Sequence, residues 1–184
     1  HPLKNLNALG DAGYLITSNK KFADRAKKLI NHGMKNRGVV EEFGYVSRMD
    51  NIQAAVLNFR LKKLKKIISI RRKNARLYSS LLNKQFIELP FDEKGYFSTY
   101  HTFVIKVKNR DKLKNYLLKK GISTSIHYPI PIHLQKASSS LGYKIGSFPI
   151  TELQAKKILT LPINQYLSEN NIRYISKMIN KFYE

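Results

Sequence analysis

The chain has 184 residues, enough for one domain or slightly more, and its 42% hydrophobic content excludes a wholly disordered protein. It contains no cysteine, which excludes a disulfide framework, a thiolate nucleophile and cysteine-based zinc or iron–sulfur sites. The apolar runs are too short for a membrane span and no signal peptide is recognisable, so we expect a cytoplasmic protein.

The formal net charge is +22, from 34 lysines and arginines against 12 acidic residues. No acidic residue lies between Asp50 and Glu88, whereas basic residues are frequent there, and a helix carrying them would bind polyanions in a salt-dependent way. The competing interpretation is a solvated surface, because most of the charge is lysine and no RNA-platform motif, GXXG loop or zinc finger occurs. We favour the solvated surface over a nucleic-acid partner.

The pattern of the first 47 residues predicts few helices or strands. After a loop over residues 1–13, residues 14–17 predict a short strand, and Asn19 can cap a helix over residues 20–31 that ends at Gly33. Residues 34–47 predict a loop. One strand and one helix cannot bury a core, so we expect residues 1–47 to be the edge of a larger domain.

Residues 49–82 predict an unusually long helix, because apolar residues recur at spacings of three, four and seven. A helix of that length is not typical of a compact domain. We interpret residues 48–83 as a connecting helix, or as two helices with a bend.

Residues 84–184 alternate between short strands and helices, which predicts a small α+β domain. Ser168 is placed to cap the final helix, whose apolar residues recur at helical spacing. The expected strands cover residues 86–89, 100–108, 122–128 and 159–161, and the expected helices cover residues 111–120, 151–158 and 169–183.

Few residues suggest chemistry by themselves. The five histidines lack metal-ligand spacing, and no carboxylate is close in sequence to His127 or His133, so we expect no metal site. Lys4 lies in a loop that begins at Pro2, directly before Gly-Asp-Ala-Gly. If its amine is partly desolvated there, it can lose its proton and form a Schiff base with an aldehyde.

Several sequence blocks, in order along essentially the whole chain, resemble the DegT/DnrJ/EryC1/StrS family of pyridoxal-phosphate (PLP)-dependent sugar aminotransferases. Each block is only moderately specific, but together they are difficult to obtain by chance. They are His1-Pro2-Leu3-Lys4-Asn5-Leu6 with Gly10-Asp11-Ala12-Gly13; Asn31-His32-Gly33; Gly44 to Asp50 with Gln53-Ala54-Ala55; Tyr100-His101 with Phe103-Val104-Ile105; Gly121-Ile122 with Ile126-His127-Tyr128-Pro129 and His133; and Leu161-Pro162.

The resemblance implies that Lys4 forms the Schiff base with PLP and shuttles protons, and that Asn5 lies in the cofactor pocket. An amino acid, usually glutamate, would donate its amine to a keto group of a nucleotide-linked sugar. Lysine rather than histidine at position 4 favours transamination over the dehydratase subgroup. Members are usually homodimers, and the family's asparagine that reaches across the dimer to the PLP phosphate is replaced here by Val46.

The resemblance also implies substrate contacts. Arg48 would hold a carboxylate or phosphate, with an ordinary ion pair at a helix start as the alternative. His127 and Tyr128 would border the active site, with a strand end buried by packing as the alternative for Tyr128.

The implied fold class is α/β, as the C-terminal part of a fold-type-I PLP-dependent transferase: the edge of the large domain, a long linking helix and a small α+β domain. The family's phosphate cup and ring-pairing aspartate precede the lysine and are not in this chain, so we expect it to be inactive by itself. Two alternatives remain. One is a non-catalytic basic module that binds nucleic acid or an acidic partner, and the other is a remnant that folds poorly.

Overall fold

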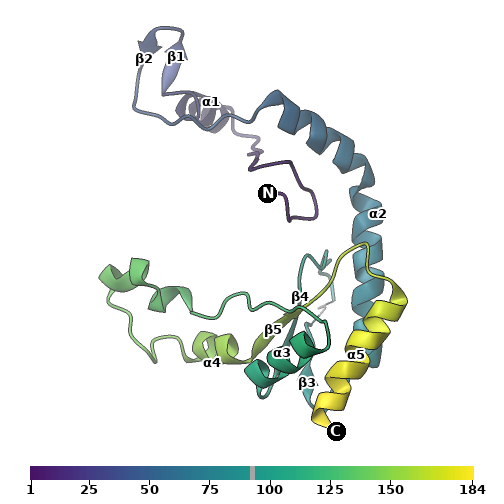
Figure 1. Ribbon diagram of the computed structural model, residues 1–184. Coiled ribbons are helices and arrows are strands. Elements are labelled where there is room, and N and C mark those ends of the chain that lie inside the picture. The colour runs from purple at the N-terminus through teal and green to yellow at the C-terminus, as the bar shows by residue number, and fades with distance from the viewer. Residues whose placement is uncertain (92–93) are drawn as a thin grey trace. The chain divides into compact units, whose positions relative to one another are not determined.

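The computed structural model describes residues 1–91 and 94–184, which form two compact units, His1–Lys65 and Lys66–Glu184 (Figure 1). Helix α2 (Asn51–Leu81) is one continuous helix, as the long apolar periodicity predicts, and the boundary between the units falls within it. The three-part division at residues 47 and 83 stays a prediction. None of the helices in the described residues is both long and apolar enough to cross a membrane.

The second unit contains an antiparallel sheet in the order β3 (Ile87–Glu88), β4 (Phe103–Val107) and β5 (Ile158–Leu161). Burial alternates along β4, where every second residue from Phe103 to Val107 is fully buried. Alternate residues of a strand point to opposite faces, so one face of this strand meets the core.

Three helices contribute to this core: the C-terminal part of α2, α3 (Arg110–Lys119) and α5 (Glu169–Tyr183) (Figure 1). The apolar stripe of α5 is buried as predicted, and the Ser168 side chain caps the helix by accepting from the N–H of Asn171. The rings of Tyr78 and Phe103 stack with their centroids 5.1 Å apart, which joins α2 to β4. Residues 66–184 therefore have a hydrophobic core of their own.

A polar stripe on α2 fixes the chain that follows β5. Arg71, Asn74 and Tyr78 are spaced by three and four residues, so they share one face of the helix. Their donors reach backbone carbonyls: Arg71 Nη1 to Ile163 O at 2.9 Å, Asn74 Nδ2 to Asn164 O at 3.0 Å, and Tyr78 Oη to Pro162 O at 2.9 Å. Burial lowers the pKa of Arg71 and raises the pKa of the Tyr78 phenol, because both charged forms lose hydration.

The predicted strand over residues 122–128 is wrong. Only an isolated bridge between Ser125 and Thr160 forms there, and two 3₁₀ helices follow, η1 (Ile132–Leu134) and η2 (Lys136–Leu141). Pro129 and Pro131 have no N–H to continue a ladder, which limits this segment to one bridge. Helix α4 (Pro149–Lys157) begins two residues earlier than predicted, because proline is favourable at the first helical position.

In the first unit, α1 (Lys20–Leu29) forms as expected, and the Asn19 side chain accepts from the N–H of Phe22 at 3.1 Å. Two other expectations are wrong. Residues 34–47 contain a short hairpin of β1 (Met34–Asn36) and β2 (Val39–Val40), because Gly38 adopts a positive φ at the turn. Residues 14–17 are not a strand, since no described segment pairs with them.

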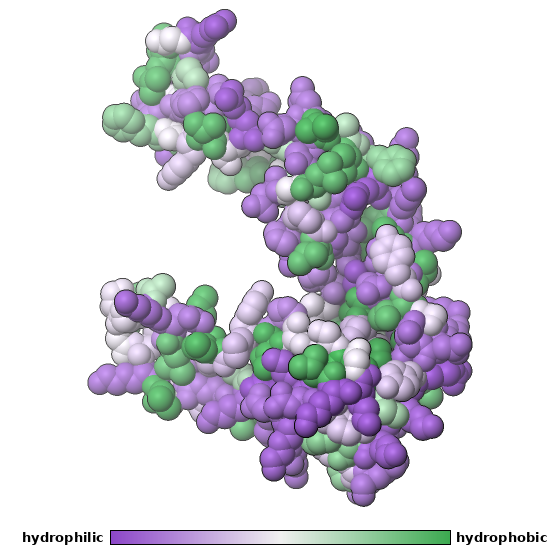
Figure 2. Space-filling model, viewed as in Figure 1, coloured by the Kyte–Doolittle hydropathy of each residue, from purple (hydrophilic) through white to green (hydrophobic). Residues whose placement is uncertain are grey.

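The first unit does not bury a core of its own, which agrees with the expectation for residues 1–47 within it. Within residues 1–65, all of which are described, Ala8 is the one fully buried apolar residue. Large apolar side chains lie on the surface instead, as the green atoms over α1, the hairpin and the start of α2 show (Figure 2). Examples are Leu15, Ile16, Phe43, Val46 and Phe59.

We predict that Tyr78→Phe destabilises the second unit by about 1.5 kcal/mol, because the half-buried Pro162 carbonyl loses its donor while the ring packing remains. Urea unfolding measures the change. Tyr166→Phe is the matched control, since its side chain is exposed in the same loop, and it should leave stability within error. Equal effects of the two variants would contradict the prediction.

Candidate functional site

The loop that carries Lys4 is held by its own backbone and by α2. The N–H of Lys4 donates to His1 O at 3.1 Å, and the N–H of Leu9 donates to Oε1 of Gln53 at 2.8 Å. Gly10 packs closely on the same side chain, because a Cβ there would lie 3.2 Å from Gln53 Nε2. The structure thus brings together two blocks of the resemblance that are more than forty residues apart in sequence.

The Lys4 side chain is exposed and Asn5 is half-buried. The sequence made Schiff-base chemistry at Lys4 conditional on a partly desolvated amine, and Lys4 is exposed in this chain. The reason is that the first unit buries almost nothing, so few groups are available to exclude water from Lys4.

Two other blocks meet where residues 29–33 lie against residues 44–47. The N–H of His32 donates to Tyr45 O at 2.9 Å, and the N–H of Ser47 donates to Ile30 O at 3.0 Å. Gly44 permits this close approach, since a Cβ there would lie 2.3 Å from the backbone nitrogen of Gly33. The crossing places Arg48 directly after it, before the start of α2.

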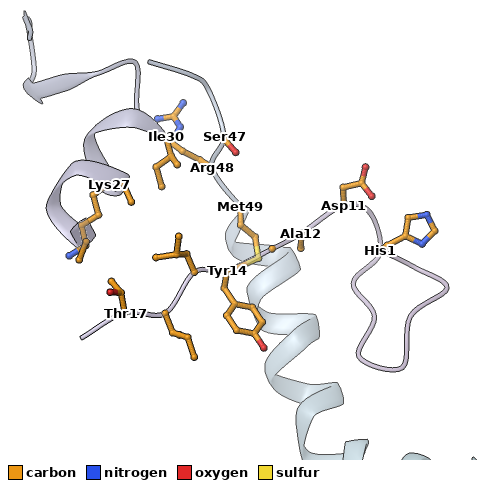
Figure 3. A pocket seen from close by; sticks show the side chains of 15 residues that line it. His1, Asp11, Ala12, Tyr14, Thr17, Lys27, Ile30, Ser47, Arg48 and Met49 are labelled. Atoms are coloured by element: carbon orange, nitrogen blue, oxygen red, sulfur yellow. The ribbon is translucent and has the colours of Figure 1, made fainter. Parts of the chain in front are cut away.

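Arg48 is exposed, and its Nη1 donates to Oδ1 of Asn31 at 3.4 Å, a long hydrogen bond to a neutral amide. It lines an open cavity of about 910 Å³ together with Ser47, Met49, residues 11–17 and one face of α1 (Figure 3). Lys4 and Asn5 are not among the lining residues.

The walls of this first cavity are largely apolar. Figure 3 shows Tyr14 on the segment of residues 11–17 and Ile30 directly after α1, with Met49 beside Arg48 and Ser47. Asp11, Lys27 and Arg48 add charge at the edges. Such a lining suits packing of apolar groups between the segment and the helix more than it suits a cofactor.

His127 and Tyr128 belong to the second unit. His127 Nδ1 hydrogen-bonds with Thr160 Oγ1 at 2.8 Å, and Thr160 is buried in β5. Tyr128 is 72% exposed, so the alternative of a strand end buried by packing is wrong for it. Both line a cavity of about 430 Å³ whose other walls are residues 130–135, α4 and Ile158.

One interaction was missed in the sequence. His133 is buried, and its Nε2 lies 3.0 Å from Oε1 of Glu152, so a carboxylate nineteen residues away reaches this histidine. The only sequence signal is the position of Glu152 in the first turn of α4, after Pro149. Within residues 1–91 and 94–184, no group of three or more histidines and carboxylates is placed to hold a metal ion.

Comparison with known proteins identifies one family. The model of the DegT/DnrJ/EryC1/StrS aminotransferase family matches residues 1–180. A pleiotropic regulatory protein of Geobacillus stearothermophilus is 37% identical over 99% of this chain and 50% of its own length. A dTDP-3-amino-3,4,6-trideoxy-alpha-D-glucose transaminase of Streptomyces venezuelae is 36% identical over 91% of this chain and 44% of its own length.

Solved structures of aminotransferases resemble the chain as well. The S. venezuelae protein DesV, crystallised in complex with a ketimine intermediate, superposes with a TM-score of 0.96 at 33% identity, over 100% of this chain and 50% of that one. A DegT DnrJ EryC1 StrS aminotransferase from Brucella abortus gives a TM-score of 0.92 at 34% identity, over 99% and 49%. The chain spans about half the length of these relatives, and its fold confirms the expected class, part of a fold-type-I PLP-dependent transferase.

We predict that Gly44→Ala disrupts the crossing before Arg48, because the added Cβ would overlap the backbone of Gly33. Amide hydrogen exchange at Tyr45 and Ser47 should accelerate at least about tenfold, since their hydrogen bonds to Leu29 and Ile30 are lost. Gly13→Ala is the control, because no atom lies within 4 Å of its added Cβ. Protection unchanged in Gly44→Ala would refute the prediction.

We predict that Thr160→Val frees the His127 ring at a cost of about 1 kcal/mol in stability, because valine keeps the volume of threonine but not its hydroxyl. The NMR signals of the imidazole should then show averaged side-chain rotamers. Thr160→Ser retains the hydroxyl and should retain the parent spectrum. A fixed ring in the valine variant would show that the hydroxyl does not orient it.

Proposed function

Because the chain belongs to the DegT/DnrJ/EryC1/StrS aminotransferase family, we propose that it is the C-terminal portion of a PLP-dependent sugar aminotransferase. The enzyme moves an amino group from an amino acid, glutamate by expectation, to a keto group of a nucleotide-linked sugar. The names of the relatives support this substrate class, since they include transaminases of dTDP-linked and UDP-linked sugars. The product would enter polysaccharide or deoxyamino-sugar synthesis.

The observation that carries the proposal is the position of Lys4, within the matched range and in a loop that Gln53 ties to α2. Its exposed amine is accessible to the aldehyde of PLP, although the desolvation that makes it reactive would have to come from the remainder of the enzyme. The half-buried amide of Asn5 can donate a hydrogen bond to the cofactor. When bound, PLP supplies the electron sink that transamination requires. With cofactor and substrate bound, the Nζ atom of Lys4 would accept a proton from the substrate carbon and pass it to the cofactor.

The remaining residues bind and orient substrate in this proposal. The Arg48 guanidinium, which donates a long hydrogen bond to Asn31, can turn to pair with a carboxylate or phosphate. His127, fixed by Thr160, and the exposed Tyr128 face the sugar substrate. Val46 cannot donate a hydrogen bond through its side chain, so Ser47 or a backbone N–H takes the cross-subunit phosphate contact.

The exposed apolar surface of residues 1–65 supports a homodimer as the working form, and we propose that this homodimer is cytoplasmic. Large apolar side chains there would be covered by the remainder of the enzyme and by a second subunit. The 184 residues alone would then be inactive, because half of the length of the relatives lies outside them.

The basic-module alternative receives less support. Arg72 Nη1 donates to Ser98 O at 2.6 Å, Arg71 donates to carbonyls of its own unit, and Lys73 pairs with Glu169 at 2.6 Å. These three basic side chains of the stretch are engaged in contacts within their own unit, which leaves them less available to a polyanion. The exposed lysines earlier in α2 remain a solvated surface.

We predict that Lys4→Ala in the full-length protein abolishes the visible absorbance of bound PLP and lowers transamination by at least about a thousandfold, because the amine that bonds the cofactor is gone. Spectroscopic titration with PLP and a coupled glutamate assay measure the two effects. Lys112→Ala, an exposed lysine of α3, is the control. An unchanged absorbance band in Lys4→Ala would overturn the assignment.

A further inference from the structure

The segment from Tyr128 to Phe148 has little burial to hold it in place. It contains the two 3₁₀ helices, and every residue from Leu141 to Ile150 is exposed. Large apolar side chains such as Ile132 and Ile145 face solvent. A segment with so few apolar contacts opens easily unless polar interactions fix it.

The Glu152 carboxylate provides such interactions. Its two oxygens accept from the N–H of Gly146 at 2.9 and 3.0 Å, and Oε1 also accepts from the N–H of Phe148 at 3.3 Å. Oε1 lies 3.0 Å from Nε2 of His133. One side chain of α4 therefore holds the chain on both sides of η2, through His133 in η1 before it and Gly146 after it.

The charge state of this cluster follows from its chemistry. The backbone N–H of Gly146, and then the His133 side chain, hold the pKa of Glu152 below its usual value, so the carboxylate is ionised at neutral pH. An ionised carboxylate only accepts hydrogen bonds, so Nε2 of His133 carries the proton that it donates. The Phe148 ring packs edge-on against His133, 4.8 Å between centroids, and covers the contact.

The same segment forms one wall of the cavity of about 430 Å³. His127, Tyr128, Ile130, Ile132 and Gln135 line that wall. The facing wall consists of Thr151, Gln154 and Ala155 of α4 with Ile158. Glu152 lies on the helix of the second wall and hydrogen-bonds His133, which stands between the lining residues Ile132 and Gln135 of the first. It therefore ties the chain of the first wall to the helix of the second.

We propose that Glu152 is a positioning residue, which acts through His133 and Gly146 to hold the 128–148 segment in the shape that binds the sugar substrate. This inference rests on the proposed function, in which His127 and Tyr128 face that substrate. Glu152 touches neither substrate nor cofactor. Its role is to keep the wall that carries these two residues at a fixed distance from α4.

Glu152→Gln in the full-length protein tests the inference. Glutamine keeps the size of the side chain, but it places an NH₂ donor where Gly146 presents its own N–H. Amide exchange at Gly146 and Phe148 should accelerate at least about tenfold, while that of Ile105 and Leu159 in the sheet is unchanged. The KM for the nucleotide sugar should rise about fivefold or more, with kcat and the KM for glutamate within about twofold of the parent.

Two further comparisons make the result specific. Glu169→Gln, which changes the same group at an exposed site paired with Lys73, should match the parent in exchange and in both KM values. His133→Gln keeps an N–H donor, so its KM for the nucleotide sugar should rise less than that of Glu152→Gln. His133→Leu has no donor, so its KM should rise as much as that of Glu152→Gln.

The outcomes separate the two claims. Accelerated exchange with a selective rise in sugar KM supports the inference. An active parent together with unchanged exchange, or with an unchanged sugar KM, in Glu152→Gln overturns the inference and leaves the proposed function standing. A parent without activity towards any nucleotide sugar overturns both.

Discussion

The second unit depends on one face of α2 donating hydrogen bonds to distant backbone carbonyls. Arg71 reaches not only Ile163 but also the carbonyls of Tyr100 and His101, so a single guanidinium joins the chain entering β4 to the chain leaving β5. Asn74 and Tyr78 continue the same row. These carbonyls belong to irregular segments and have no ladder to satisfy them, so the helix supplies the donors that a sheet would otherwise supply.

The two units therefore differ in what they can do alone. Residues 66–184 bury a continuous core and orient polar side chains through contacts of their own, as Thr160 does for His127 and Glu152 does for His133. In residues 1–65, Gln53 and Gly44 fix the backbone of the Lys4 loop and of the segment before Arg48. Side chains such as that of Lys4 remain exposed to water. A reactive amine needs a desolvated environment, which the first unit does not create by itself.

Helices were predicted well because their signals are local. Asn19 and Ser168 cap the helices that they were expected to cap, and the apolar periodicity correctly indicated one long helix in α2. Strands were predicted less well because a strand forms only where a second segment of the chain pairs with it by backbone hydrogen bonds. Residues 14–17 and 122–128 have strand-like composition, yet the first lacks a partner in the described chain and prolines end the second after one bridge.

The sequence by itself determined the family, the helices and the place of Lys4 within the family's motifs. Each of these depends on residues that are near one another in the sequence or on motifs that follow in a fixed order. Only the tertiary structure decided which polar groups meet. Gln53 reaches the Lys4 loop across forty-four positions and Arg71 reaches Ile163 across ninety-two, and Glu152 finds His133 across nineteen. Such pairs depend on how helices and loops pack, and packing brings together residues that no spacing in the sequence connects.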